Sequence, residues 1–372
     1  MKKTRLLALG LSIASIPTVV APVITLTSCG GQKISVPDIT EEGTIVILAT
    51  GGTIAGSGEE GKETGYTPGS ISVESLIASV PGIEDIAPLH AQQVCNINSD
   101  DITAKIWVQL AKTINAYADD PEVAGFVVMH GTDTMEETAY FLNLAVKTDK
   151  PVVITGSMRP ATAISADGPM NLYQSVVVAA NPESKGKGVM GVFSDSIYSA
   201  RSMQKVSTFD VTAISAGPMG ALGFVRNKEV FFYEESIKLH THKSDKFWIL
   251  PEDKNKKDLP KVAIIYIEAD ADPTIINWAK ESGAKGLVIA GAGAGEFSEK
   301  FVKKIKSVVS KNFPVVISSR IDNGVIVQDS VLVEGTVAAN DLPPQKAAVL
   351  LRLALGLGIT KQEDLIPIYK KY

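Results

Sequence analysis

A run of apolar residues at 123–129 (VAGFVVM), followed at once by a sharp polar turn, most constrains how this chain can fold. A strand that is apolar at nearly every position is typical of a parallel sheet covered on both faces. Thr134 and Glu137 have the spacing of a capping box, which predicts that a helix begins after the turn. Thr132 and Asp133 then lie between a strand and a helix, where open α/β sheets bind ligands. Taken alone, this turn is more typical of a helix cap than of a site.

The strand-and-turn pattern recurs and predicts an α/β fold of two domains. We expect a larger N-terminal domain at 43–235, with a mostly parallel sheet flanked by helices, and a smaller C-terminal α/β domain at 261–372. Residues 236–260, rich in Lys, Asp, His and Pro, are expected to link them. The expected strands include 43–49, 151–156, 188–193, 223–225, 230–233, 261–267, 286–291, 314–318 and 325–327, and the expected helices include 73–80, 101–117, 273–282, 296–311 and 343–356.

Length and charge exclude some classes of function. The chain has 372 residues, which is enough for an extensive core in each domain. Its net charge is -5 and its pI is about 5.6, so no basic field favours nucleic acid as a partner.

The first residues resemble a targeting segment. Lys2, Lys3 and Arg5 precede an uncharged apolar run at 6–26, and Cys29 follows small residues, as in a bacterial lipobox. We therefore expect residues 1–28 to be a lipoprotein signal peptide, Cys29 to be lipidated, and residues 29–42 to form a tether that holds the protein on the outer side of the cell membrane. An uncleaved anchor helix is the alternative, because the run is long enough to span a bilayer.

Several polar residues follow expected strands in the larger domain. Thr53 comes after the first strand, within a Gly-rich turn, and a polar segment that contains Tyr66 follows as an expected mobile lid. Tyr66 could bring its phenol over the site, or it could only pack the lid shut. Lys205 follows a later strand, although a solvated surface lysine is the ordinary interpretation. A threonine hydroxyl is a poor nucleophile without a base, and a lysine amine held by a carboxylate can supply one. Metal-free acyl transfer is therefore the chemistry that these residues favour.

Other residues have simpler interpretations. Ser99 and Asp100 precede the expected helix at 101–117 and could cap it, although a hydroxyl there can also hold a carboxylate. If Cys29 is lipidated, Cys95 is the only other cysteine and a structural role is expected for it. His240 and His242 have no third ligand nearby in sequence, so they are only a weak signal for a metal.

Two motifs carry a family resemblance. Residues 49–55 (ATGGTIA) and 130–138 (HGTDTMEET) resemble the two signature motifs of the bacterial L-asparaginase family, specifically its exported type II enzymes. The similarity extends from about residue 44 to residue 372. It includes the segments 154–160, 165–171 and 344–347.

The resemblance implies hydrolysis of the side-chain amide of asparagine through an acyl-threonine intermediate, without a cofactor or a metal. Thr53 would be the nucleophile and Tyr66 the lid tyrosine that activates it. Thr132, Asp133 and Lys205 would form a second, relay triad. The substrate would be bound by Ser99, Asp100, Thr132 and Asp133, with Ser99 on the α-carboxylate and Asp133 on the α-ammonium.

The resemblance also implies a homotetramer built as a dimer of dimers, in which each site is closed by a neighbour's smaller domain. Two positions depart from the family pattern. Asp100 stands where close relatives usually have Gln, and Ala294 stands where a partner-supplied Asn is frequent. An acidic residue that the partner often adds has no clear match near Val331. These departures affect substrate preference and affinity, while the catalytic set is complete.

Two alternatives to an asparaginase share many of these features. A glutaminase-dominant amidase would use every one of the catalytic residues. An amino-acid-binding lipoprotein would have the same anchor and two α/β domains, but it would not need Thr53, Thr132, Asp133 and Lys205 together.

Overall fold

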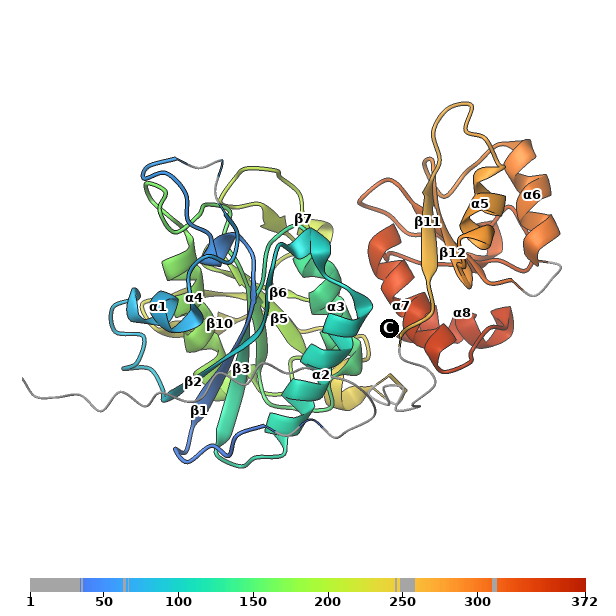
Figure 1. Ribbon diagram of the computed structural model, residues 1–372. Coiled ribbons are helices and arrows are strands. Elements are labelled where there is room, and N and C mark those ends of the chain that lie inside the picture. Colours follow the sequence, from blue (N-terminus) through green and yellow to red (C-terminus); the bar gives the residue numbers. More distant parts are fainter. Residues whose placement is uncertain are drawn as a thin grey trace, which may run out of the picture.

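Two sheets of mostly parallel strands, each flanked by helices, form the part of the chain that the computed structural model describes (Figure 1). That part comprises residues 34, 36–62, 65, 67–244, 246–247, 258–309 and 313–372. The expected fold class, a larger α/β domain followed by a smaller one, is confirmed. The expected signal peptide, Cys29 and Tyr66 lie outside the described residues.

The larger sheet places the ends of two strands side by side. Strand β1 (Thr44–Gly51) is buried along its whole length and pairs in parallel with β2 (Leu89–Ile97) on one side and β3 (Val123–Met129) on the other. The strand order reverses between β1 and β3, which is where α/β sheets of this order bind ligands. Beyond β3 the sheet continues with parallel β4 (Val152–Thr155) and β5 (Val189–Phe193), then with antiparallel β6 (Ser196–Ser199), β9 (Gly223–Arg226) and β10 (Glu229–Phe232).

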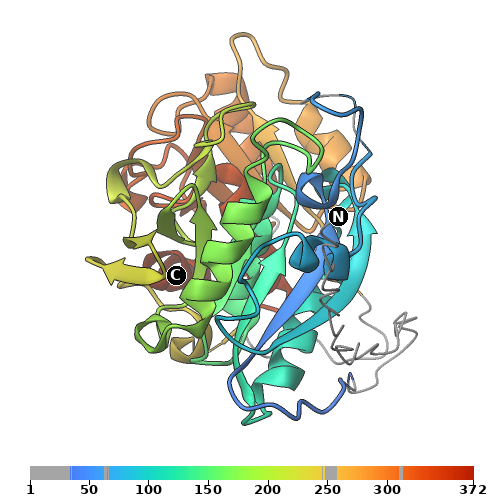
Figure 2. The ribbon, with the colours of Figure 1, turned by 90° about the vertical axis from the view of Figure 1, so that its left-hand side faces the viewer.

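Helices cover both faces of this sheet. Helices α1 (Val73–Ala78) and α4 (Gly168–Ala180) pack on one face, as Figure 2 shows for α4. Helices α2 (Ala104–Ala118) and α3 (Met135–Ala145) pack on the other face. Both faces are thus removed from water, which explains why β1 and β3 are apolar along most of their length instead of alternating.

The smaller sheet has the order β11 (Val262–Tyr266), β12 (Gly286–Gly291), β13 (Val315–Ser319) and β14 (Val337–Ala338), all parallel. Helices α5 (Ile275–Glu281) and α6 (Glu299–Val309) contribute to a core on one face, and α7 (Pro344–Gly356) packs on the other. The expected strand at 325–327 is wrong. Val325 and Val327 are 59% and 56% exposed, and only Ile326 between them is buried, in an isolated bridge to Asn340.

Several short elements complete the described chain, and one of its helices was not expected. Helix α8 (Gln362–Lys371) packs against β14 although it contains Pro367. The short elements are the two-stranded sheet of β7 (Gln204–Lys205) and β8 (Ile214–Ser215), and the 3-10 turns Thr53–Ala55, Ser99–Asp101, Pro182–Ser184, Gly217–Met219, Thr241–Lys243 and Gln328–Ser330.

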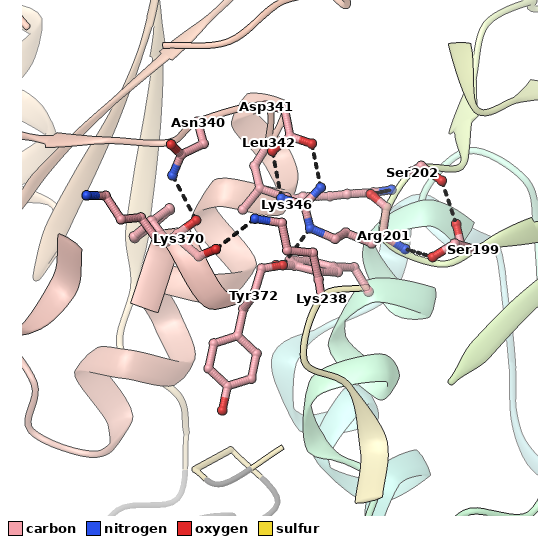
Figure 3. A network of polar contacts seen from close by, with 12 residues as sticks. Ser199, Arg201, Ser202, Lys238, Asn340, Asp341, Leu342, Lys346, Lys370 and Tyr372 are labelled. Carbon is pink, nitrogen blue, oxygen red and sulfur yellow. Dashed lines mark hydrogen bonds and ion pairs between the residues drawn. The ribbon is translucent and has the colours of Figure 1, made fainter. Parts of the chain in front are cut away.

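The two domains share a hydrophobic core and a polar network. Helix α7 lies between the smaller sheet and α3 of the larger domain (Figure 1), and buried residues of both helices belong to the same apolar cluster. Beside it, Arg201 donates to both carboxylate oxygens of Asp341 at 2.5 and 2.7 Å, and to the main-chain oxygen of Tyr372 at 2.6 Å (Figure 3). The Arg201 side chain is only 8% exposed, so this ion pair is largely removed from water.

The first part of the expected linker is packed rather than solvated. His240 and Thr241 are buried, and the N–H of Leu239 donates to the main-chain oxygen of Lys371. Residues 248–257 lie outside the described residues. Within the described chain, no helix combines the length and the apolar character needed to cross a bilayer.

The buried ion pair between the domains predicts a stability effect. Asp341→Ala leaves the Arg201 guanidinium buried without its carboxylate, so we expect the free energy of unfolding to fall by about 3 kcal/mol in urea titrations. Asp149→Ala is the matched control, because its pair with Lys185 is 3.2 Å long and mostly exposed. That change should cost less than about 1 kcal/mol. Equal losses in the two variants would contradict the assignment of a buried interdomain pair.

Candidate active site

The turns after β1 and β3 touch each other through two glycines. Gly51 and Gly52 have φ values of 103° and 82°, which L side chains rarely adopt. A Cβ added at Gly52 would lie 2.4 Å from the Cα and N atoms of Gly131, so a side chain there would separate the turns. Thr53 and Thr132 are the next residues in the two turns, and both are buried. The close approach of the glycines therefore places the two threonines in neighbouring turns.

Ser99 packs against the same turn from the end of β2. A Cβ added at Gly131 would lie 2.8 Å from the Oγ atom of Ser99. Ser99 is buried, whereas its neighbour Asp100 is exposed. Neither residue caps α2, which begins at Ala104 after Thr103, so the capping interpretation of Ser99 and Asp100 is wrong. Both residues are instead at the carboxyl end of the strand beside β1.

The expected capping box at the start of α3 is also wrong. Thr134 is the N-cap residue, but its side chain makes no cap hydrogen bond. Its hydroxyl donates instead to the carbonyl oxygen of Ser99 at 2.6 Å. The threonine thus ties the turn after β3 to the turn after β2, and this contact between distant residues replaces the local one that the spacing suggested.

Lys205 reaches the turn after β3 from the short strand β7. Its ammonium donates to the hydroxyl oxygen of Thr132 at 2.9 Å and to a carboxylate oxygen of Asp133 at 2.6 Å. The Lys205 side chain is 18% exposed and the Asp133 side chain 59% exposed. Asp133 is therefore open to a ligand on one side while it holds the lysine on the other.

This arrangement combines a hydroxyl, an amine and a carboxylate, with a second threonine hydroxyl in the adjacent turn. An amine that gives up its proton can accept one from a hydroxyl, and a neighbouring carboxylate orients it. Thr53, Ser99, Thr132, Asp133 and Lys205 are thus gathered at one end of the larger sheet. The resulting site suits attack on a carbonyl carbon and binding of a small polar ligand.

His130, a neutral ring, hydrogen-bonds within the turn after β3 and to the helix that follows it. Its Nδ1 lies 2.7 Å from the carbonyl oxygen of Gly131, so Nδ1 carries the proton and Nε2 accepts from the hydroxyl of Thr138 at 2.9 Å. The indole N–H of Trp107 donates to the same hydroxyl oxygen at 2.8 Å. Burial lowers the pKa of His130 to about 4, although its hydrogen bond to Gly131 opposes the shift. The ring is therefore uncharged at neutral pH.

Sequence reasoning missed the contacts of Glu136. This buried carboxylate accepts from the main-chain N–H of Lys205 at 2.6 Å and from the side-chain amide of Gln345 in α7. Glu136 lies within one motif of the resemblance and Gln345 within another, but spacing alone does not show that the two motifs meet.

Cys95, Ala294 and the histidine pair have other partners or surroundings. The Cys95 thiol donates to the carbonyl oxygen of Thr50 at 3.5 Å, and burial raises the pKa of the thiol to about 11. Ala294 lines a cavity of about 250 Å³ in the smaller domain. The rings of His240 and His242 are 6.1 Å apart, and among the described residues no three His, Cys, Asp or Glu side chains are grouped to hold a metal ion.

Family comparisons match both domains. The family described as "Asparaginase, N-terminal" matches residues 44–238, and the one described as "Glutaminase/Asparaginase C-terminal domain" matches residues 261–364.

Individual relatives cover nearly the whole chain. It is 45% identical to "L-asparaginase 2" of Bacillus subtilis (strain 168), over 90% of this chain and 88% of that protein. It is 40% identical to "Probable L-asparaginase periplasmic" of Haemophilus influenzae, over 89% of this chain and 94% of that protein. The crystal structure of a "Probable Cytoplasmic L-asparaginase" from Campylobacter jejuni superposes with a TM-score of 0.83 at 42% identity, covering 90% of this chain and 100% of that one.

The neutral state of His130 predicts a loss of stability in acid. The pKa of His130 is about 4 in the folded protein and about 6.5 when unfolded, so the unfolded chain binds the extra proton between these values. Lowering the pH from about 6.5 to about 4 should therefore reduce the free energy of unfolding by about 3 kcal/mol through this residue. In His130→Asn, urea titrations over this range should lack that part of the pH dependence. An unchanged slope would show that His130 is not the group responsible.

Proposed function

Because the chain belongs to the asparaginase family, we propose that it is an amidohydrolase that converts L-asparagine to aspartate and ammonia. Membership rests on the matches to both domains and on relatives that it resembles over most of its length. The printed names of those relatives favour asparagine as the substrate.

One observation carries the mechanistic part of the proposal. The Lys205 ammonium lies 2.9 Å from the Thr132 hydroxyl oxygen and 2.6 Å from an Asp133 carboxylate oxygen. This is the geometry expected of a relay that moves a proton to or from a threonine hydroxyl. A protein that only bound asparagine would have no use for a lysine held between these two groups.

In the proposed reaction, the Thr53 hydroxyl attacks the side-chain amide carbon of asparagine. The hydroxyl proton passes through the site to the leaving nitrogen, ammonia departs, and an ester of Thr53 remains. Water then attacks the ester, which releases aspartate and restores the threonine. Thr132, Asp133 and Lys205 are the relay that moves protons in both halves, and Tyr66, in the expected lid, is proposed to activate Thr53.

Charge and position support a specific orientation of the substrate. We assign the α-ammonium to Asp133, because its carboxylate is open to solvent next to Lys205. The α-carboxylate is assigned to Ser99, whose hydroxyl lies against Gly131. Thr132 is assigned as a further substrate-binding residue. Asp100 is exposed beside Ser99, and its negative charge should weaken binding of the carboxylate compared with a neutral amide there.

Glutamine is the second candidate substrate. The C-terminal match is to a domain described as glutaminase or asparaginase, and the proposed catalytic residues serve either amide equally well. The longer substrate differs by one methylene, so the two amides differ in how they fit between Asp133 and Thr53. Competition between them in one assay decides the preference.

We also propose a homotetramer, a dimer of dimers, as the working assembly. Apolar side chains on the smaller domain support association, because Tyr266 and Trp278 are 60% and 67% exposed. The protein is proposed to be exported and anchored to the cell membrane by a lipid on Cys29. The sequence of the first 29 residues supports this location, as does the printed name of the periplasmic relative, whereas the matched structure is described as cytoplasmic.

The assigned nucleophile and relay predict large losses of activity. Thr53→Ala, Thr132→Ala and Lys205→Met should each lower kcat/KM for asparagine by a factor on the order of 10⁴, measured as ammonia release. Thr155→Val is the matched control, because Thr155 ends the next strand of the sheet but donates to the carbonyl of Val192 instead. It should keep near wild-type activity. Full activity of Thr53→Ala would contradict the assignment of Thr53 as the nucleophile. Tight binding of asparagine without turnover by the wild type would indicate a binding protein instead of an enzyme.

Lipidation predicts where the full-length protein is found. After expression in a bacterial host, the wild type should sediment with membranes, and Cys29→Ala should move to the soluble exported fraction. Cys95→Ala is the control and should stay with the membranes, since Cys95 lies within the folded domain. A Cys29→Ala variant that still sediments would favour an uncleaved anchor helix.

A further inference from the structure

The amino end of α7, in the smaller domain, grips the segment that carries Lys205. We propose that Glu136, held by Gln345, is a positioning residue for Lys205, and that the smaller domain thereby sets the geometry of the relay within its own chain. This inference rests on the proposed function for its catalytic meaning.

Lys346 provides the first part of the grip. Its side chain is fully buried, and its Nζ donates to the carbonyl oxygens of Ala200, Arg201 and Met203 at 2.9, 2.9 and 2.5 Å. An ammonium has three N–H donors, so these three carbonyls use all of them. A buried lysine is costly unless it is fully hydrogen-bonded. Lys346 therefore holds residues 200–203 from the other domain, and Figure 3 shows it beside Arg201.

Glu136 provides the second part, at Lys205 itself. One carboxylate oxygen accepts the main-chain N–H of Lys205 and the other accepts the side-chain amide of Gln345. The Glu136 residue is 6% exposed, so water competes little for these bonds. Gln345 and Lys346 are adjacent in α7. Lys346 bonds directly to residues 200, 201 and 203, whereas Gln345 acts on Lys205 through Glu136.

The β3–α3 connection, together with the first turn of α3, holds both the backbone and the ammonium of Lys205. Glu136 lies in the first turn of α3, three residues after Asp133. The β3–α3 connection therefore binds Lys205 twice, through its backbone at Glu136 and through its ammonium at Thr132 and Asp133. Two attachment points on one rigid unit determine the direction of a long flexible side chain. Catalysis depends on such placement, since a shift of about 1 Å can cost about 100-fold in rate.

The test compares an isosteric variant with its reciprocal swap. In Glu136→Gln, the new amide has one acceptor oxygen for two donors, and its NH₂ group faces a donor. In the double variant Glu136→Gln with Gln345→Glu, the amide oxygen can accept from Lys205 and its NH₂ group can donate to the carboxylate introduced in α7, so the chain of bonds is rebuilt. Glu137→Gln is the matched control. It removes a carboxylate from the same turn of α3, but the Glu137 carboxylate makes no hydrogen bond to Lys205.

Two readouts are needed, one of which does not depend on activity. Steady-state ammonia release gives kcat and KM for asparagine. Amide hydrogen exchange over residues 200–206, followed by mass spectrometry without substrate, reports the N–H of Lys205. For Glu136→Gln we expect kcat to fall by about 10- to 100-fold with KM changed much less, and exchange in this segment to become faster. The swap should restore both quantities toward wild type, and Glu137→Gln should change neither.

Other outcomes overturn the proposal. An unchanged kcat in Glu136→Gln, or a swap that restores neither readout, would make the bridge simple packing between domains. A loss of thermal stability with normal kcat would have the same meaning. If Glu136→Gln does not fold, Gln345→Leu removes the donor from the other domain and carries the same expectations. If the wild type releases no ammonia, the proposed function fails. Unchanged amide hydrogen exchange over residues 200–206 in the variants would separately contradict the proposal that Glu136 and Gln345 position Lys205.

Discussion

The parallel pairing of β1 with β3 is the constraint on which the rest of the site depends. It places the carboxyl ends of two buried strands next to each other, and Gly52 and Gly131 let the following turns touch. A side chain at Gly52 would collide with the backbone of Gly131, so the contact requires glycine on steric grounds. Thr53 and Thr132 are neighbours in space because of this contact, although 79 positions separate them along the chain.

Lys205, part of the proposed proton relay, comes from a different part of the fold. Lys205 lies in a half-buried strand of only two residues. Its location is determined by Glu136 on one side and by the carbonyl contacts of Lys346 just before it. Lys346 is fully buried, and this burial lowers its pKa to about 7 despite the attraction of Glu136. The smaller domain thus contributes to the site from within the same chain.

The elements that could be predicted are those whose signal is local. The apolar strands 123–129 and 286–291 were expected at the bounds where the structure has them, because each is a short apolar run next to a polar turn. The capping box at Thr134 was wrong because its hydroxyl had a better partner in Ser99, which is distant in sequence. The strand at 325–327 was wrong because its valines are exposed and only Ile326 is buried. Helix α8 was missed because Pro367 lies inside it.

Strand periodicity, glycine turns and signature motifs are local properties, so the fold class, the two turns and the residue types that a threonine amidohydrolase would use could be predicted from the sequence. The family followed from those motifs and agrees with the comparisons. Which side chains meet could not be predicted in this way. The bonds of Lys205 to Thr132 and Asp133 span more than 70 positions, and the bond of Glu136 to Gln345 spans 209. Such contacts depend on how the sheet and the two domains pack. The spacing of residues along the chain does not specify which distant segments pack against each other.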